Sequence, residues 1–400
     1  MSSSPASAPD SPSELLPEVA RRGEHIPPGT GLDRMLRWVD EQQATDLHGQ
    51  AGKAFTVRIH GRLERVPEGR FPALDDADFA ALLRESFSPW AWRLIEQRTE
   101  FDLGFDHGGR RFRANFSKQR SRQSFSFRTV PQHTMKLQDL RLPESLAGTI
   151  QELRGLVLVT GPAGQGKSTT LRALVQEINE TRAARIVTVE DPIEYVFTDA
   201  LAQFEQREVG IDTASFAIGI RNAMRQDPNV IFVGEIRDRE SVFAALQAAE
   251  TGHLVLTTLH ADSAAQAVAR LREHQPAGEQ DGVSASLARN LNAIICQRLL
   301  PDVTGTRIPC VEIMRRHPGL QEAIRTNQLE LLNGMVEASV HEGMHSFDQY
   351  LVELLAAGTI TPDTARQYAV NRHRLEMRLR GVQQPAPILR PDAKPRLNHG

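Results

Sequence analysis

One stretch of nine residues, GPAGQGKST at 161–169, restricts the possible folds of this chain more than any other feature. It matches the pattern G-x-x-x-x-G-K-[ST] of a phosphate-binding loop, or P-loop. An apolar run, GLVLVT, comes directly before it, and a helical pattern, TTLRALVQEINE, overlaps its end. A P-loop requires a strand before it and a helix after it. The sequence therefore predicts an α/β domain that binds a nucleoside phosphate.

Each part of this loop has a physical role. The glycines let the backbone wrap around a phosphate with its N–H groups pointing inward, and the helix N-terminus adds its dipole. Lys167 is expected to reach the β- and γ-phosphates, and Ser168 is expected to bind Mg²⁺. The candidate nucleotide-binding residues are Gly161, Pro162, Ala163, Gly164, Gln165, Gly166, Lys167, Ser168 and Thr169.

Three more short apolar runs resemble the strand before the loop. They are RIVTVED, NVIFVGE and HLVLTTLH, with helical segments between several of them. Continuous apolar runs of this length are typical of a parallel sheet that is buried on both faces. We therefore expect a doubly wound α/β domain. The region from about 275 to 370 reads as helical.

The rest of the chain divides by composition and periodicity. We expect a disordered Ser/Pro-rich tail over 1–30, a small α+β domain over 31–131, a linker over 132–147, an α/β domain with a helical C-terminal part over 148–370 and a basic, Pro-rich tail over 371–400. Within 31–131 we expect a helix at its start, a hairpin that turns at His60-Gly61, two helices and then antiparallel strands. The tail arginines Arg372, Arg374, Arg378 and Arg380 fit a solvated helix end better than a lipid-binding surface.

Composition excludes several classes of protein. The formal net charge is −3, so nothing global indicates a nucleic-acid or membrane surface partner. No run approaches the roughly 18–20 apolar residues of a membrane span, and the N-terminus lacks the apolar core of a signal peptide. The two cysteines, Cys296 and Cys310, are too few for a four-cysteine zinc site and are expected to be buried. We expect a cytoplasmic protein that reaches a membrane only through a partner.

The strand NVIFVGEIRD at 229–238 ends unusually. P-loop hydrolases commonly place an Asp at this strand end, where it helps to hold Mg²⁺. Here Gly234 takes that position, and the acid comes one residue later, as Glu235. A carboxylate at the end of a parallel strand can face a γ-phosphate, but it can also be an ordinary surface acid.

Two histidines flank the run HLVLTTLH. An imidazole can donate to a phosphate or accept from a neighbour at neutral pH. His253 and His260 are seven residues apart, which places them on opposite faces of a strand and about 20 Å apart if it is extended. A shared metal is therefore not expected. His260, at the carboxyl end, is the candidate phosphate sensor, and a buried hydrogen-bonded histidine is the alternative.

Arginines alternate through RRFRANFSKQRSRQSFSFR at 110–128. Composition alone favours a solvated sheet face. Interleaved Arg and Phe also suit nucleic-acid binding.

Four stretches together resemble the motif boxes of the secretion-superfamily ATPases. They are GLVLVTGPAGQGKSTTL, VTVEDPIEYVF, RNAMRQDPNVIFVGEIRD and AAETGHLVLTTLHADSA. The resemblance covers about residues 31–370 and is nearest to the PilT-type pilus retraction ATPases. It implies a RecA-like ATPase domain with a parallel sheet, a PAS-like N-terminal domain before it and helices after it. It also implies a homohexamer that hydrolyses ATP with Mg²⁺ and works on an inner-membrane platform protein, without nucleic acid and from the cytoplasmic face of the membrane.

The resemblance also implies roles for single residues. In this family the strand regularly ends with Gly then Glu, so Glu235 is implied as the general base or water-positioning acid. Acid near Mg²⁺ would come from Glu190, Asp191 and Glu194. Arg113 and Arg128 would neutralise charge that develops on the γ-phosphate. Arg120 and Arg122 compete for one further arginine position.

The chain departs from the pattern in places. Ala163 and Gln165 stand at variable loop positions where the family usually has hydroxyl side chains. Retraction ATPases carry an AIRNL helix motif, whereas the aligned stretch here is GLQEA at 319–323, and EAIRTNQ comes a turn later. The alternatives are therefore a DotB-type ATPase of a type IV secretion or conjugation system and a non-hydrolysing accessory paralogue.

Overall fold

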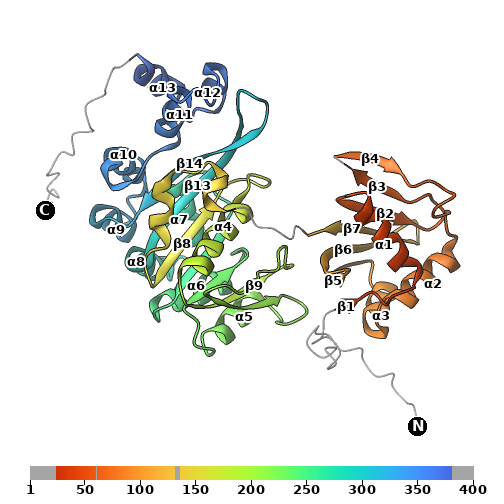
Figure 1. Ribbon diagram of the computed structural model, residues 1–400. Helices are drawn as coiled ribbons and strands as arrows, with labels where there is room; N and C mark the ends of the chain where they lie inside the picture. Colours follow the sequence, from red (N-terminus) through yellow and green to blue (C-terminus); the bar gives the residue numbers. More distant parts are fainter. Residues whose placement is uncertain (1–23, 60, 131–135, 381–400) are drawn as a thin grey trace, which may run out of the picture. The chain divides into compact units, whose positions relative to one another are not determined.

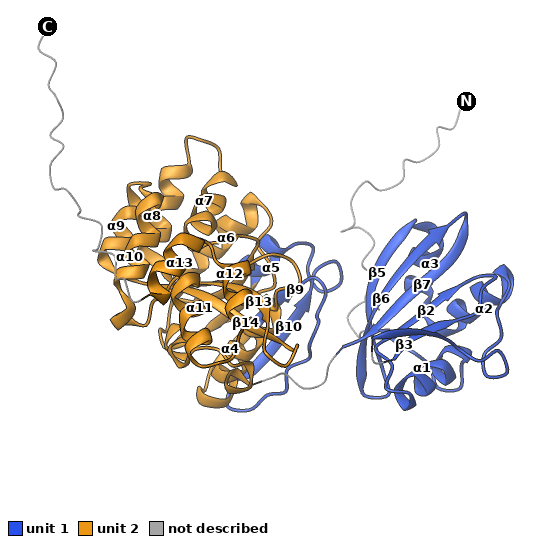
Figure 2. Cartoon of the chain, turned by 90° about the horizontal axis from the view of Figure 1, so that it is seen from above, with its two compact units in different colours: residues 1–134, 187–222 blue, residues 135–186, 223–400 orange. Residues whose placement is uncertain are grey.

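The computed structural model describes residues 24–59, 61–130 and 136–380 (Figure 1). The chain separates into two compact units. Unit 1 comprises residues 1–134 and 187–222, and unit 2 comprises residues 135–186 and 223–400, as coloured in Figure 2. The predicted site residues are divided between these two units.

A seven-stranded sheet forms most of unit 1. Its strand order is β1-β5-β6-β7-β2-β3-β4, and every neighbouring pair except β1 with β5 is antiparallel. The strands are β1 (Glu24–His25), β2 (Asp46–Gln50), β3 (Thr56–Ile59), β4 (Arg62–Arg65), β5 (Glu100–His107), β6 (Arg110–Gln119) and β7 (Arg122–Thr129). The helices of the same segment are α1 (Gly31–Glu41), α2 (Asp76–Ser86) and α3 (Pro89–Gln97).

Apolar spacing explains how these helices pack. Helix α1 begins where the Thr30 side chain accepts a hydrogen bond from the Asp33 amide. Its buried residues include Leu32, Met35, Leu36 and Val39, which are the positions that the sequence periodicity predicted. A group of phenylalanines fills the core, among them Phe55, Phe79, Phe105, Phe112 and Phe127. The predicted helix, hairpin, helix pair and antiparallel strands of this segment are all confirmed.

The expectation of disorder over 1–30 is wrong for the residues that the structure describes there. Glu24 and His25 pair in parallel with Phe105 and Asp106 of β5, and Ile26 is buried. A two-residue edge strand leaves no periodic signal in a Ser/Pro-rich sequence, so composition could not show it. Residues 1–23 lie outside the described part of the chain.

The second sheet has the order β10-β9-β11-β12-β8-β13-β14. β11 pairs in parallel with β12, and β12 pairs in parallel with β8, as predicted for these three of the four apolar runs. Its strands are β8 (Gly155–Thr160), β9 (Arg185–Glu190), β10 (Gln203–Glu208), β11 (Val230–Val233), β12 (Leu254–Leu259), β13 (Leu291–Pro301) and β14 (Arg307–Arg315). Every residue of β8, β11 and β12 is buried, which explains their unbroken apolar sequences.

Helices connect and follow these strands. They are α4 (Lys167–Thr181), α5 (Phe216–Ala223), α6 (Arg239–Glu250), α7 (Ala264–Glu273), α8 (Gln280–Asn290), α9 (Pro318–Arg325), α10 (Leu332–Ala338), α11 (Phe347–Ala356), α12 (Pro362–Tyr368) and α13 (Arg372–Leu379). None of the helices in the described ranges is long and apolar enough to cross a membrane.

The helical prediction for 275–370 is wrong over residues 291–315. There β13 and β14 form an antiparallel hairpin, and β13 also pairs in parallel with β8. A short apolar run such as LNAIICQRLLP does not distinguish a buried strand from a buried helix by periodicity. Pairing with β8 decides the outcome.

Two boundary segments also differ from the expectation. The predicted linker at 132–147 contains a 3₁₀ turn, Leu137–Leu140, and the start of another, Glu144–Ile150, while residues 131–135 lie outside the described ranges. The predicted tail begins with helix α13, where Leu375 is buried. Arg374 and Arg378 of this helix form ion pairs with Glu337, so they are not simply a solvated end. Residues 381–400 lie outside the description.

Both cysteines are free and buried, as predicted. Burial raises the pKa of the Cys310 thiol and of the Cys296 thiol. Burial therefore disfavours the thiolate form of both cysteines.

Candidate nucleotide-binding site

Three parallel strands of unit 2 bring the predicted phosphate residues to one edge of the sheet. The P-loop follows β8, Glu235 follows β11 and His260 follows β12. Because β8, β12 and β11 are neighbours and run in the same direction, their carboxyl ends meet at the same edge. Ligands of open α/β sheets bind at this edge.

The loop itself depends on glycine. Gly161, Gly164 and Gly166 have φ angles of +145°, +73° and +79°. At Gly161 an added Cβ would also lie 2.3 Å from the backbone oxygen of Gln297, a contact that no side chain could accommodate. The loop leads directly into α4, whose first-turn N–H groups and dipole suit an anion.

Lys167 is buried and turned toward its own loop. Its Nζ donates to the backbone oxygens of Gly161 and Pro162, at 2.8 and 2.9 Å. The same Nζ lies 3.4 Å from Nδ1 of His260. Burial lowers the pKa of Lys167, and the charge of Glu235 opposes that shift. The ammonium group is thus held ready at the loop, where phosphate oxygens could replace the two carbonyls.

Glu235 lies between a histidine and an arginine. Its Oε1 is 3.0 Å from Nε2 of His260, and its Oε2 accepts from Nε of Arg237 at 2.9 Å. Its side chain is 18% exposed, so it can still meet water. The strand end is fixed because Thr258 Oγ1 donates to the backbone oxygen of Gly234, at 2.7 Å. The structure therefore brings Lys167, His260 and Glu235 into one connected group.

His253 lies at the opposite end of β12. Its Nδ1 contacts the backbone oxygen of Ala248 and the hydroxyl of Thr251, so it closes the turn after α6. His253 is therefore a hydrogen-bonded histidine, as the alternative interpretation expected, but it is only partly buried.

Gln297 of β13 is a site residue that sequence reasoning missed. Its Nε2 donates to the backbone oxygen of Gln165, and its Oε1 accepts from the hydroxyl of Thr170, both at 2.7 Å. Gln165 in turn accepts from the Leu299 amide through its side chain, at 2.7 Å. Gln165, at a variable position of the loop, therefore links the loop to β13. The sequence signal that could have identified Gln297 is that it is a single amide side chain within the apolar run IICQRLL.

A pocket of about 360 Å³ adjoins the loop in unit 2. The start of α4 forms one side of it through Gly166, Thr169 and Thr170. Leu140, Leu299 and Pro309 are among the apolar residues of the other side. A pocket with apolar walls next to a phosphate loop suits the planar base of a nucleotide.

The remaining predicted residues lie in unit 1. Glu190 ends β9, is buried and accepts from Thr188 Oγ1 and Gln206 Nε2, at 2.7 and 3.1 Å. The Arg113 guanidinium is 3.9 Å from the Glu194 carboxylate, so these two groups of the candidate site are neighbours.

Arg113 and Arg128 face each other across β6 and β7. Arg128 also pairs with Asp46 at 2.7 Å, while its side chain stays 70% exposed. Arg120 and Arg122 flank the turn at the far end of these strands, about 20 Å from Arg113 by strand rise. Only Arg113 and Arg128 form a pair on one face.

Mg²⁺ would need ligands from the nucleotide. In the parts of the chain that the structure describes, no group of three or more His, Cys, Asp or Glu side chains could hold a metal ion. Ser168 is exposed in the first turn of α4, beside the loop glycines. One hydroxyl next to a phosphate loop fits Mg²⁺, which commonly takes its other ligands from phosphates and water.

Comparison with known proteins identifies the family to which this chain belongs. The family model described as "Type II/IV secretion system protein" matches residues 116–335. The "Twitching motility protein" of Neisseria gonorrhoeae is 38% identical over 317 residues, which cover 79% of this chain and 84% of that protein. The chain belongs to the type II/IV secretion system protein family. The predicted resemblance is therefore confirmed.

Solved structures of related ATPases confirm the predicted fold class. The "Crystal Structure of the Pilus Retraction Motor PilT and Bound ADP" matches with a TM-score of 0.79 and 36% identity, covering 86% of this chain and 98% of that one. The DotB ATPase of Legionella pneumophila matches with a TM-score of 0.73 and 25% identity, covering 90% and 99%. The chain thus has the fold of a PilT-like secretion ATPase.

The stretch that departs from the retraction motif lies in α9. Both GLQEA and the following Ile324 and Arg325 belong to this one helix. Leu320, Ala323 and Ile324 are buried, whereas Arg325 is exposed and pairs with Glu322 at 2.6 Å. The arginine of the shifted stretch is therefore presented on the surface of unit 2.

Proposed function

We propose that this protein is the ATP-hydrolysing motor of a type IV pilus and that it acts in pilus retraction. The observation that carries this proposal is the connected group of Lys167, His260 and Glu235 at the carboxyl edge of the sheet. The names of the related twitching motility protein and of the PilT retraction motor support the pilus role.

Binding would begin at the P-loop. The β- and γ-phosphates take the loop N–H groups, and Lys167 Nζ moves its hydrogen bonds from the carbonyls of Gly161 and Pro162 to phosphate oxygens. The base enters the pocket between the start of α4 and Leu299. Ser168 would hold Mg²⁺, which would supply positive charge to neutralise the phosphates.

Hydrolysis would use the carboxylate of Glu235. Glu235 orients a water molecule and accepts its proton as the oxygen attacks the γ-phosphorus and the bond to the β-phosphate oxygen breaks. His260 holds the other side of this carboxylate and faces Lys167, so it can sense whether a γ-phosphate is present. Glu190 would supply further acid near the metal, and Arg113 and Arg128 would neutralise the developing phosphate charge.

The motor would work as a homohexamer. Closure of the domains around each nucleotide would convert hydrolysis into movement of an inner-membrane platform protein. The protein would lie in the cytoplasm and be recruited to the inner face of the membrane by that partner.

The deciding experiment measures steady-state ATP hydrolysis by the purified protein and by Glu235→Gln. We expect kcat to fall about 10²–10⁴-fold in the variant, because the carboxylate that accepts the proton is lost. Light scattering follows ring formation in parallel, since rings should persist in Glu235→Gln.

The matched control is Glu273→Gln, which makes the same change at an exposed position of α7. This control should hydrolyse ATP like the parent. A parent ring that hydrolyses no ATP, or a Glu235→Gln variant as active as the parent, would overturn the motor proposal.

A second candidate is a DotB-type secretion ATPase, which the match to DotB favours. Deletion of the gene in its own organism distinguishes the two. Surface pili that no longer retract indicate the pilus motor, and lost secretion or conjugation with normal pilus dynamics indicates the DotB type. The accessory paralogue is disfavoured because Lys167, Glu235 and His260 are all present and in contact.

A further inference from the structure

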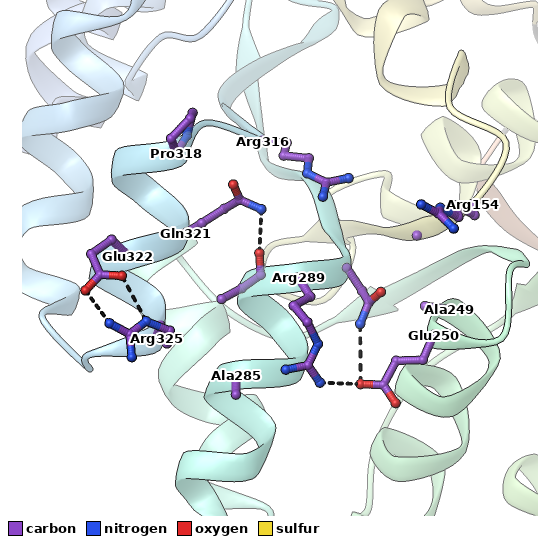
Figure 3. Close-up of a pocket in the computed structure, with 13 residues that line it drawn as sticks. Arg154, Ala249, Glu250, Ala285, Arg289, Arg316, Pro318, Gln321, Glu322 and Arg325 are labelled. Atoms are coloured by element: carbon purple, nitrogen blue, oxygen red, sulfur yellow. Dashed lines mark hydrogen bonds and ion pairs between the residues drawn. The ribbon is translucent and has the colours of Figure 1, made fainter.

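A second pocket in unit 2, of about 920 Å³, lies at the opposite end of β8 from the P-loop. Arg154 and Gly155, at the start of β8, line it together with the ends of α6 and α8 and one face of α9 (Figure 3). Strand β8 has six residues, so its length separates this pocket from the P-loop by about 20 Å. The pocket is therefore not part of the nucleotide site.

The lining of this pocket carries a positive charge. It contains four arginines and two glutamates, which gives a formal charge of +2. They are Arg154, Arg289, Arg316, Arg325, Glu250 and Glu322.

Both glutamates are already neutralised by arginines. Glu250 accepts from Ser286 Oγ at 2.7 Å and from Arg289 at 2.9 Å, and these hydrogen bonds lower its pKa. Glu322 pairs with Arg325 at 2.6 Å. Figure 3 draws both ion pairs as dashed lines. The excess charge of the pocket therefore belongs to the other two arginines.

Arg154 and Arg316 are exposed, and within the described ranges their guanidinium groups have no hydrogen bond or ion pair. In Figure 3 they lie on the side of the pocket away from Glu322 and Arg325. Their backbones are held by one residue: Asn292 Nδ2 donates to the Arg154 oxygen at 2.7 Å, and the Arg316 amide donates to the Asn292 oxygen at 2.8 Å. Asn292 therefore holds the backbones of the two arginines at a fixed distance from each other.

The lining of this pocket also contains small and uncharged residues. Ala249, Ala285 and Ala288 are among them. Gln321 lines the pocket too and donates to the Ala288 oxygen at 2.7 Å, which ties α9 to α8. A lining that combines small apolar residues with polar ones suits a peptide, whose backbone and side chains make both kinds of contact.

We propose that this pocket docks an acidic peptide segment of a partner protein, with side-chain carboxylates on Arg154 and Arg316. Arginine recognises a carboxylate with two parallel hydrogen bonds, so two such groups would match the excess charge of +2. The proposed occupant therefore carries at least two carboxylates, one for each of these two arginines.

The test uses the full-length protein saturated with MgADP, so that the P-loop is filled. The probe is a fluorescein-labelled hexaglutamate peptide, and its binding is followed by fluorescence anisotropy. We expect the double variant Arg154→Ala/Arg316→Ala to bind the peptide at least about tenfold more weakly, as losing two charge-assisted contacts implies. Parent binding should weaken between 50 and 300 mM salt, roughly as exposed charges are screened.

The matched control is Arg372→Ala, which removes an exposed arginine of α13 outside the pocket. This variant should bind hexaglutamate like the parent. ADP affinity should be unchanged in all three proteins, which confirms that the variants are folded.

A charge reversal completes the design. Arg154→Glu/Arg316→Glu should reject hexaglutamate and bind hexalysine, a gain that misfolding could not produce. The proposal is overturned if the parent does not bind hexaglutamate or if the double alanine variant binds it equally well. Binding of inorganic pyrophosphate in place of the peptide, dependent on Arg154 and Arg316, would overturn it in favour of a phosphate site.

Discussion

At the scale of single residues, two histidines on one strand have opposite surroundings. His260 contacts both Glu235 and Lys167, whereas His253 contacts the backbone oxygen of Ala248 in the last turn of α6. The two residues have the same chemistry and lie about 20 Å apart along β12, which makes them a natural pair for comparison.

We predict that His260→Ala lowers kcat for ATP hydrolysis about 10²-fold and changes ADP affinity little. The reason is that His260 orients the carboxylate of Glu235, which acts only during hydrolysis. Steady-state kinetics and ADP titration measure the two effects separately. His253→Ala is the control and should hydrolyse ATP normally, so equal losses in both variants would contradict the assigned role of His260.

His345 gives a prediction on pH. Burial lowers the pKa of His345 from 6.5 to about 4. Below the unfolded pKa the unfolded chain binds more protons than the folded one, so stability falls as the pH drops from about 6.5 toward 4. At pH 5 this costs about 2 kcal/mol.

Denaturant unfolding at pH 7 and pH 5 checks this effect. The loss of unfolding free energy between the two pH values should be about 2 kcal/mol smaller in His345→Gln, which cannot titrate. The same loss in both proteins would show that His345 protonation does not contribute. His341→Gln, on an exposed side chain nearby, serves as the control.

At the scale of elements, β13 lies beside the P-loop and contacts it at several points. The backbone of Gln297 touches Gly161, and its side chain bonds to Gln165 and Thr170, so one strand contacts the start, middle and end of the loop region. A loop that must wrap a phosphate is more useful when its shape is fixed beforehand. These contacts come from the β13–β14 hairpin, for which the sequence had predicted helix.

We predict that Gln297→Leu weakens ADP binding about tenfold. The substitution keeps the size of the side chain but leaves the Thr170 hydroxyl and the Gln165 oxygen without their partner, at a cost of about 1–3 kcal/mol. Isothermal titration with MgADP measures the change. Gln247→Leu, at an exposed position of α6, should bind normally, and unchanged affinity in Gln297→Leu would show that β13 does not shape the loop.

At the scale of the whole molecule, the predicted site residues are divided between the two units. The P-loop, Glu235 and His260 belong to unit 2, while Glu190, Arg113 and Arg128 belong to unit 1.

We predict that Arg113→Ala/Arg128→Ala lowers kcat about 10–10³-fold and leaves ADP binding intact, because these arginines would neutralise charge that develops on the γ-phosphate. Light scattering should still detect rings. Arg62→Ala, on an exposed strand of the same unit, is the control. Weaker ADP binding with unchanged kcat would contradict a role in hydrolysis.

The sequence by itself determined the parts of this protein that depend on local pattern. The P-loop glycines, the apolar runs of β8, β11 and β12, and the Gly-Glu strand end each carry their signal within a few residues. Parallel strands then oblige Lys167, Glu235 and His260 to meet at one edge.

Only the tertiary structure decided the contacts that join distant segments. The β13–β14 hairpin exists because β13 pairs with β8, about 130 residues earlier, and Gln297 reaches the P-loop only through that pairing. The edge strand at Glu24 forms because β5 offers it a partner. Such contacts depend on partners that no local stretch contains, and so periodicity and composition cannot specify them.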